Sequence, residues 1–249
     1  MKKLIALLLA LTMIFAFAAC AKAPAKEETK TLTMACSADF PPYEFVNDDG
    51  SYAGIDVDIA QAICDKLGYK LEVKDMDFDG IIAAVESGAV NFAMSGLTIT
   101  DERKESVNFS DSYAKGVQVI VVKEGSKIAT VDDLDGAKIG VQAGTTGDFY
   151  CTDDYGQENV SQYTKYAMAV EALKNGQVDC VVLDNEPAKA FVEANEGLKI
   201  LDTAYADEDY AAAFNKNDTE LLEQFNKALG ELKADGTLDK IVETYINAK

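Results

Sequence analysis

Arg103 is the residue of this chain whose type most directly suggests chemistry. It ends the stretch SGLTITDER (95–103) and is the only arginine among 23 basic residues, in a chain whose formal net charge is −20. A guanidinium presents a rigid, planar fork of N–H donors that matches a carboxylate with two hydrogen bonds, which a lysine ammonium does poorly. Keeping one arginine where every other cation is lysine therefore indicates that Arg103 binds a carboxylate. The alternative is a surface ion pair with its neighbours Asp101 or Glu102.

Two other turns carry groups that could bind a small polar molecule. QAGTTGD (142–148) follows an apolar run and opens an expected helix, so its free N–H groups can bind an anion, while Thr145 or Thr146 can cap the helix. The motif is neither GxGxxG nor a Walker loop, which argues against a nucleotide phosphate, and a plain helix cap is the simpler interpretation. VDCVVLDNEP (178–187) ends a buried-looking strand at Asp184, whose carboxylate can hold an ammonium group or cap the next helix.

Aromatic residues follow the first two expected strands. Phe40 lies in SADFPPYEF (37–45), and Phe78 lies in DMDFDG (75–80). Aromatic rings at the mouth of a cleft can flank a ligand side chain, although core packing is the more common role of any single phenylalanine.

The composition argues against several kinds of chemistry. The chain has no histidine, no GxSxG motif and no nucleophile beside a recognisable general base, so nothing points to an enzyme. We expect no cofactor, and no metal site, because no cysteine pair has CxxC spacing. Cys36 could pair with Cys64, and Cys151 with Cys180, or these residues could remain core thiols.

The N-terminal segment predicts export. MKKLIALLLALTMIFAFAAC begins with two lysines, continues through a short apolar run and ends in small residues, which is typical of a signal peptide over residues 1–19 rather than of a membrane span. FAAC resembles a lipobox, with Phe17 in place of the usual leucine, so Cys20 is expected to carry a lipid that anchors the protein to the outer face of the cell membrane. Alternatively, an ordinary signal peptidase could use Ala16-Phe17-Ala18 and leave a secreted or periplasmic protein. Residues 20–30 are typical of a flexible tether.

The acidity of the mature chain limits its partners. Removal of residues 1–19 takes away two lysines and no acidic residue, which makes the net charge more negative. Phosphate contacts need clustered Lys or Arg, so we expect no nucleic-acid partner, and charge would not hold the protein on an anionic membrane. We expect a monomer that only its anchor keeps at the membrane.

Short apolar strands alternate with amphipathic helices, a pattern that predicts α/β layers with largely parallel strands. The strands are expected at 31–37, 70–76, 91–96, 116–125, 137–142, 178–184 and 198–202, and the helices at 54–68, 78–90, 145–151, 166–177 and 186–195. The tail over 217–246 predicts two helices broken at Asp235-Gly236. Two α/β series joined by extended segments indicate two lobes with a cleft, where ligands bind beyond the carboxyl ends of the strands.

From about Thr31 to the C-terminus, the chain resembles the extracellular solute-binding proteins, family 3, of ABC transporters for polar amino acids. The resemblance rests on motifs that follow the family's order: FPPYEF, GIDVDIAQAI, MDFDGIIAAVESG, SGLTITDERKESVNFSDSY, KIGVQAGTTGD, VVLDNEPA and ELKADGTLDKIVETY. It implies an α/β, two-lobed periplasmic-binding-protein fold of type II, whose lobes are joined by two hinge strands and close over a ligand in the cleft. Lobe 1 would comprise residues 31–115 and 211–249, and lobe 2 residues 116–210, with hinges near 113–117 and 206–210.

The resemblance also implies roles for individual residues. Arg103 would bind the α-carboxylate of an amino acid, beside the hydroxyl and N–H of Thr98 and an N–H of Thr146. Asp184 and the carbonyl of Gly96 would hold the α-ammonium. Residues implied to contact the ligand's side chain are Phe40 and Phe78, which would flank it, and Ser37, Ser95 and Gln142, which would contact its far end.

The function implied is binding of a free polar amino acid outside the cytoplasm and its delivery to an ABC transporter permease, without chemistry. Several relatives that bind glutamine or cationic amino acids carry an aspartate where this chain has Ser37. We therefore expect a neutral polar amino acid first and a cationic one second. One alternative is a periplasmic dehydratase-like enzyme on the same fold, which would also keep an arginine for its substrate. A second is a ligand-sensing module of a receptor, but the chain as given ends at Lys249 without a predicted span or kinase, which favours a solitary binding protein.

Overall fold

The computed structural model describes residues 30–202 and 204–246. The expected signal peptide, the lipidation site Cys20 and the tether up to residue 29 lie outside the described residues. Within the described part of the chain, none of the helices combines the length and apolarity needed to cross a bilayer.

The first sheet has five strands in the order β5-β1-β6-β14-β7. They are β1 (Thr31–Cys36), β5 (Lys70–Asp75), β6 (Phe92–Ala93), β7 (Val107–Phe109) and β14 (Ala213–Asn215). β1 runs parallel to β5 and β6, while β14 runs antiparallel to β6 and β7. The sheet therefore joins strands from the beginning of the described chain to one near its end.

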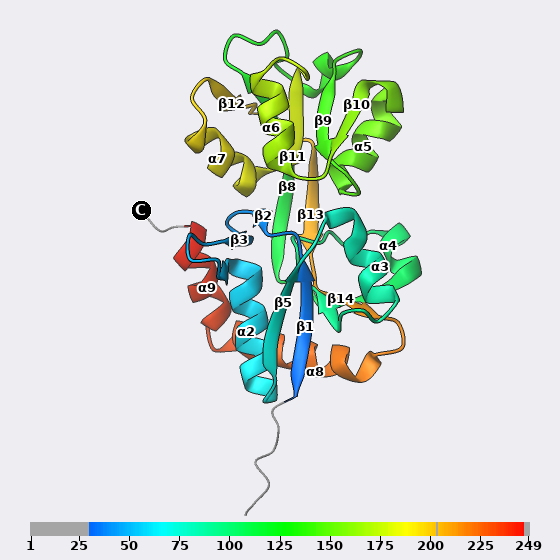
Figure 1. Cartoon of the computed structure of the whole chain (residues 1–249), viewed down its shortest axis with the longest axis vertical. Coiled ribbons are helices and arrows are strands. Elements are labelled where there is room, and N and C mark those ends of the chain that lie inside the picture. The colour runs from blue at the N-terminus through cyan, green and yellow to red at the C-terminus, as the bar shows by residue number, and fades with distance from the viewer. Residues whose placement is uncertain (1–29, 203, 247–249) are drawn as a thin grey trace, which may run out of the picture.

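Helices cover both faces of this sheet, as Figure 1 shows. They are α2 (Ile55–Leu67), α8 (Thr219–Ala234) and α9 (Thr237–Ile246) on one face, with α3 (Ile81–Glu86) and α4 (Asp101–Ser106) on the other. Because side chains alternate along a strand, Met34 of β1 packs in the cluster that contains α2 and α8, whereas Ala35 packs in the cluster that contains α3. The expected break at Asp235-Gly236 is confirmed, since α8 ends at Ala234 and α9 begins at Thr237.

A small antiparallel sheet, which the sequence pattern did not predict, lies between β1 and α2 in the chain. It has the order β2-β3-β4, with β2 (Asp39–Phe40), β3 (Glu44–Val46) and β4 (Tyr52–Ala53). Its strands are only two or three residues long, too short for hydrophobic alternation to be recognised. The sheet positions Phe40 and Glu44, both buried, near the end of β1.

The second sheet has the order β10-β9-β11-β8-β12, with β13 also paired to β8. Its strands are β8 (Ala114–Lys123), β9 (Ile139–Gln142), β10 (Val160–Tyr163), β11 (Cys180–Asp184), β12 (Leu198–Ile200) and β13 (Ala206–Tyr210). β9 runs parallel to β10 and β11, as expected, but β8 is antiparallel to β11, β12 and β13. The prediction of largely parallel strands is therefore wrong for β8, because β8 brings the chain in from the first sheet and runs in the opposite direction.

Helices also cover both faces of the second sheet. They are α5 (Thr146–Tyr155), α6 (Tyr166–Lys174) and α7 (Asn185–Ala194). Val119 and Val121 of β8 pack in the cluster that contains residues of α6 and α7, while Ile120 and Val122 pack in the cluster that contains Cys151 of α5. This alternation is the period of two that a strand buried on both faces requires.

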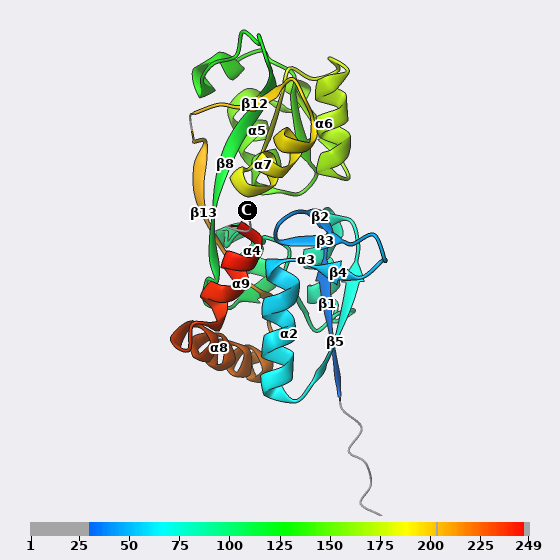
Figure 2. The ribbon, with the colours of Figure 1, turned by 90° about the vertical axis from the view of Figure 1, so that its left-hand side faces the viewer.

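Two paired strands connect the two sheets. β8 carries the chain from the first sheet to the second, and β13 carries it back. The two strands pair antiparallel from Ala206 opposite Gln118 to Tyr210 opposite Ala114. Figures 1 and 2 show this pair running between the two bodies of the molecule. We propose that lobe 1 comprises 31–115 with 211–249 and lobe 2 comprises 116–210, with the hinges in this paired segment.

All four cysteines of the described chain are buried free thiols, so neither of the two pairings considered from sequence is present. Burial raises the pKa of the Cys64 thiol to about 11 and that of Cys151 to about 12. Such thiols remain protonated at neutral pH and behave as small apolar side chains of the core.

Phe225 of α8 tests the attachment of the C-terminal helices to the first sheet. Its ring lies 5.7 Å from that of Phe92 and 5.0 Å from that of Phe214. We expect Phe225→Ala to lower the free energy of unfolding by about 3–5 kcal/mol, because it removes a fully buried ring and leaves a cavity. Denaturant unfolding measures the change, with the exposed Lys227→Ala of the same helix as control; equal stability of the two variants would contradict the packing.

Candidate functional site

A pocket lies between the two sheets. Its lining residues are Ser37, Phe40, Glu44, Phe78, Ser95, Gly96, Thr98, Arg103, Gln142, Thr145, Thr146, Tyr166 and Asp184. All ten residues singled out from the sequence lie in this set. Four of them stand at or just beyond the carboxyl ends of strands: Ser37 after β1, Ser95 after β6, Gln142 at the end of β9 and Asp184 at the end of β11. The structure thus brings the predicted residues together where such sheets place ligands.

Arg103 is buried, with 6% of its surface exposed. It lies in the first turn of α4, where the hydroxyl of Thr100 accepts from its backbone N–H at 3.1 Å. Its guanidinium donates to the carbonyl of Thr98 at 2.9 Å and to that of Gly144 at 3.0 Å, and stacks 5.5 Å from the ring centre of Phe78. These contacts come from both sides of the pocket and hold the fork in one orientation.

The alternative of a surface ion pair is not what the structure contains. Among the described residues, no carboxylate lies within 4.0 Å of the Arg103 guanidinium. Burial lowers the pKa of Arg103, and the more distant Glu208 opposes this shift. Two of the five N–H donors of a guanidinium are used here, so three remain for an anion in the pocket. A buried cation without an adjacent anion is a site that an anionic group stabilises.

Two backbone N–H groups lie beside this cation. Thr146 is the first residue of α5, whose N-terminus is capped by the hydroxyl of Thr145, which accepts from Asp148 N at 3.2 Å. Within the described chain, the N–H groups of Thr98 and Thr146 donate to no other group, and the helix dipole makes the second favourable for an anion. The hydroxyl of Thr98, however, donates to Glu208 at 2.9 Å, so it is not available to a carboxylate as the resemblance implied.

Asp184 is a buried carboxyl group at the end of β11. It accepts from Gln118 Nε2 at 2.9 Å and from the hydroxyl of Tyr210, and it makes no capping bond to α7, so the helix-cap alternative is wrong. Burial, followed by the charge of Glu208, raises the pKa of Asp184 to about 8. A carboxyl group in this state becomes fully ionised once a cation reaches it.

Glu208 belongs to this site but was missed from sequence. It lies on β13, is buried, and accepts from Thr98 Oγ1 at 2.9 Å and from Gln118 Nε2 at 3.1 Å. Its segment ADEDY appears as an acidic, solvent-exposed run, and only the strand period places Glu208 and Tyr210 on the buried face, with Asp207 and Asp209 exposed. That alternation was the available signal.

A second pair of buried carboxyl groups, Glu44 and Asp56, lies at the other end of the pocket. Glu44 accepts from the hydroxyl of Ser95 at 2.6 Å, and neighbouring Asp56 accepts from Gly96 N at 2.9 Å and from Tyr113 at 2.7 Å. Burial and then the charge of Asp56 raise the pKa of Glu44 well above its usual range, while burial raises that of Asp56 to about 6. Burial therefore favours the protonated form of both carboxyl groups, and the charge of Asp56 adds to this effect at Glu44.

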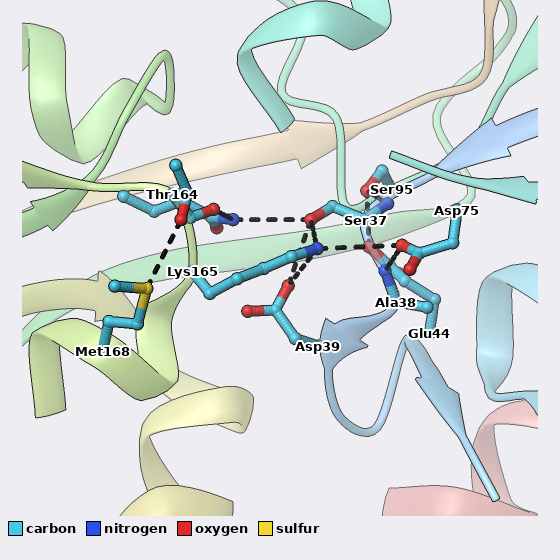
Figure 3. Close-up of polar contacts among 10 residues, drawn as sticks. Ser37, Ala38, Asp39, Glu44, Asp75, Ser95, Thr164, Lys165 and Met168 are labelled. Carbon is cyan, nitrogen blue, oxygen red and sulfur yellow. Dashed lines mark hydrogen bonds and ion pairs between the residues drawn. The ribbon is translucent and has the colours of Figure 1, made fainter. Parts of the chain in front are cut away.

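Hydrogen-bond donors at this end of the pocket are already used, as Figure 3 shows for Ser37 and Ser95. The hydroxyl of Ser37 donates to Asp39 at 3.0 Å, and that of Ser95 donates to Glu44. The side-chain amide of Gln142 donates to Thr164 O at 2.9 Å and to Ser37 Oγ at 3.4 Å. The polar side chains that line the far end are thus left with oxygen acceptors, among them the Glu44 carboxyl and the Gln142 carbonyl.

Aromatic rings form the remaining wall. Phe40 stacks between Tyr43 and Tyr166, with ring centres 5.7 Å and 5.8 Å apart. Gly96 has φ +52°, and a Cβ there would lie 2.7 Å from Phe40, so both its backbone conformation and the adjacent ring require glycine. Tyr166 was not anticipated from sequence, where it was read as the start of a helix. In the described residues no cluster of metal-ligating side chains occurs.

Comparisons with known proteins agree with this geometry. Residues 32–248 match the family model for bacterial extracellular solute-binding proteins, family 3. Over 260 aligned residues the chain is 34% identical to the arginine-binding extracellular protein ArtP of Bacillus subtilis (strain 168), with 100% of each chain covered. Among solved structures, an ancestral arginine-binding protein bound to arginine has a TM-score of 0.82 and 45% identity, covering 87% of this chain and 98% of that one. An ancestral arginine-binding protein bound to glutamine has a TM-score of 0.83 and 44% identity, covering 87% of this chain and 97% of that one. The two-lobed α/β fold expected from sequence is confirmed.

The raised pKa of Asp184 makes a pH prediction for the ligand-free protein, prepared by unfolding and refolding. The pKa of Asp184 is about 8 in the folded protein and about 3.9 in the unfolded chain. Because the unfolded chain ionises first, the contribution of Asp184 to the free energy of unfolding is complete below about pH 3.9 and is lost as the pH rises from there through about 8. Asp184→Asn keeps the neutral form at every pH. We expect the variant to match the wild type near pH 4 and to exceed its free energy of unfolding by a few kcal/mol near pH 8.5, with the exposed Asp207→Asn as control. Parallel stability curves between pH 4 and 9 would contradict the assignment.

Proposed function

The chain belongs to the bacterial extracellular solute-binding proteins of family 3, and from this premise we propose how its pocket binds a free amino acid for delivery to an ABC transporter permease. The family is one of solute-binding proteins, so the chain is not an enzyme. The observation that carries the proposal is one of charge: Arg103 and Asp184 are both buried in the same pocket, and within the described part of the chain neither has an oppositely charged side chain within 4.0 Å. An amino acid is the zwitterion that supplies both missing partners.

The α-carboxylate is assigned to the end of the pocket near α4 and α5. Arg103 has three N–H donors left after its bonds to Thr98 and Gly144. The N–H groups of Thr98 and Thr146 add donors from either side of the pocket. Because these donors belong to different lobes, the carboxylate binds better when the lobes are closed, and differential contact of this kind shifts the population toward the closed state.

The α-ammonium is assigned to Asp184, with the carbonyl of Gly96 as a second acceptor. Asp56 holds the Gly96 N–H at 2.9 Å, which leaves the carbonyl as the ligand-binding group of that residue. Glu208 lies behind Asp184 and raises its pKa, so the pair favours a cation more strongly than Asp184 alone. Binding of an ammonium would therefore ionise Asp184 and release its proton.

We propose that the ligand's side chain is cationic and rich in donors, as in arginine. A neutral polar ligand was the first expectation from sequence, with a cationic one second, and the free acceptors at the far end favour the second. Burial raises the pKa of Glu44, and the charge of a guanidinium beside it would oppose this rise and favour the ionised carboxylate. Phe40 and Tyr166 line the pocket, and aromatic rings near a cation attract it. The names of several relatives, which bind arginine or histidine, agree with this class.

The protein is extracytoplasmic, in keeping with its family. We further propose that it is a monomer anchored by a lipid on Cys20 after removal of residues 1–19. The support is the lipobox-like sequence FAAC at the end of a short apolar run. The anchor would hold an acidic protein near its permease when charge alone would not.

The carboxylate clamp predicts that Arg103→Lys weakens binding of every α-amino acid that the protein binds. We expect at least a tenfold loss of affinity, or about 1.4 kcal/mol, because an ammonium replaces a fork that holds two hydrogen bonds. Calorimetric titration, with ligands chosen by a thermal-shift screen of the twenty amino acids, measures the change. The control is Lys104→Met, an exposed cation on the same helix. Unchanged affinity in Arg103→Lys would sink the assignment.

The far-end proposal predicts a change in selectivity in Glu44→Gln. Arginine and citrulline have nearly the same shape, but citrulline carries no side-chain charge. Since glutamine cannot ionise, we expect arginine affinity to fall about tenfold or more while citrulline affinity changes by less than threefold. The exposed Glu86→Gln serves as control. Equal losses for both ligands, or tighter binding of citrulline than of arginine by the wild type, would refute a cationic ligand.

A further inference from the structure

Lys165 reaches across the pocket rim from one lobe to the other. It immediately precedes α6 of the second sheet, yet its Nζ lies 3.0 Å from Ser37 Oγ, 3.5 Å from Asp39 Oδ1 and 3.7 Å from Asp75 Oδ1. Ser37 follows β1 and Asp75 ends β5, both strands of the first sheet, while Asp39 belongs to β2 of the small sheet that follows β1. Figure 3 shows the ammonium pointing into this group of oxygens. Three N–H donors thus face three acceptors of the opposite lobe.

Contacts within lobe 1 also hold the partners of Lys165 in place. Asp75 accepts from Ala38 N at 2.9 Å, and Asp39 accepts from the hydroxyl of Ser37 at 3.0 Å. The side chains of Lys165, Asp39 and Asp75 are 26%, 19% and 38% exposed, so water and salt screen the group only in part. It is a prearranged acceptor site for one cation at the rim of the pocket.

No other ion pair of residues 30–202 and 204–246 crosses the pocket in this way. Those of Lys66 stay within the first lobe, and those of Lys174 and Lys189 join residues three apart on a helix. Lys115 pairs with Asp209 between the adjacent strands β8 and β13. When the lobes separate about the hinge, Lys165 alone among these cations loses its partners.

Lys165 lies outside the pocket lining, and so do Asp39 and Asp75, so its two ion pairs are made away from the ligand, although its third partner, Ser37, lines the pocket. A contact made only between closed lobes slows opening without changing how the ligand enters the open cleft. It therefore acts on the dissociation rate, and by the same factor for every ligand.

On the basis of the proposed binding function, we propose that Lys165 is a positioning residue that holds the closed lobes together over the ligand through Ser37, Asp39 and Asp75, and so lengthens the residence time of every ligand equally.

The test compares dissociation and association rates of arginine and glutamine by stopped-flow fluorescence for the wild type and Lys165→Met. We expect dissociation of each ligand to be about five-fold faster and association to change less than two-fold, as suits two partly exposed ion pairs. The difference should shrink in 0.5 M NaCl, because salt screens the pairs. Lys165→Arg should recover most of the wild-type rate.

The matched control is Lys174→Met at the other end of α6. It removes the same charge, but the ion pair that it breaks, with Glu171, lies within the helix. The double variant Asp39→Asn with Asp75→Asn removes the contacts from the other lobe, so it tests the proposal even if Lys165→Met misfolds, and adding Lys165→Met to it should have little further effect. Unchanged dissociation, a change confined to one ligand, or an equal change in Lys174→Met would overturn the proposal. Absence of amino-acid binding by the wild type would instead refute the proposed function, so the two failures are distinguishable.

Discussion

The buried guanidinium of Arg103 is the group on which the rest of the site depends. It donates to the backbone of Thr98 on one side of the pocket and of Gly144 on the other, so a single cation joins both walls. Burying an arginine without an adjacent anion costs free energy, and this cost is offset when a carboxylate enters from solution. The cap from Thr100 and the stacking on Phe78 hold the fork ready for that carboxylate.

Three buried carboxyl groups, Glu44, Asp184 and Glu208, make the same site favourable for cations, because buried negative charge also costs free energy. Glu44 lies at one end of the pocket, while Asp184 and Glu208 lie at the other. Burial, followed by the charge of a neighbouring carboxylate, raises the pKa of Glu44 and of Asp184 and so favours their protonated forms. A ligand with two cationic groups and one carboxylate would restore the charged forms. The charges of such a ligand would therefore offset the buried charges of the site.

Closure and recognition share residues because the connecting strands carry part of the site. Gln118 lies on β8 and Glu208 on β13, and both are bonded to groups that line the pocket. A change in the pairing of these strands would therefore move Thr98 and Asp184 relative to each other. The ion pairs of Lys165 with Asp39 and Asp75 differ from these contacts, since they join the lobes through residues outside the pocket lining. Affinity thus combines a part that depends on the ligand and a part that depends only on closure.

The sequence by itself determined the chemical types and their local elements: alternation predicted the α/β layers, motif order predicted ten pocket residues, and the single arginine predicted a carboxylate site. Only the tertiary structure decided which groups meet. Lys165 contacts Ser37 across 128 positions, and Glu208 contacts Thr98 across 110, with no local pattern that marks either pair. The small β2-β3-β4 sheet, the antiparallel course of β8 and the engaged hydroxyl of Thr98 were missed for the same reason. Propensity and periodicity act between neighbours in the chain, whereas desolvation and charge pairing act between neighbours in space.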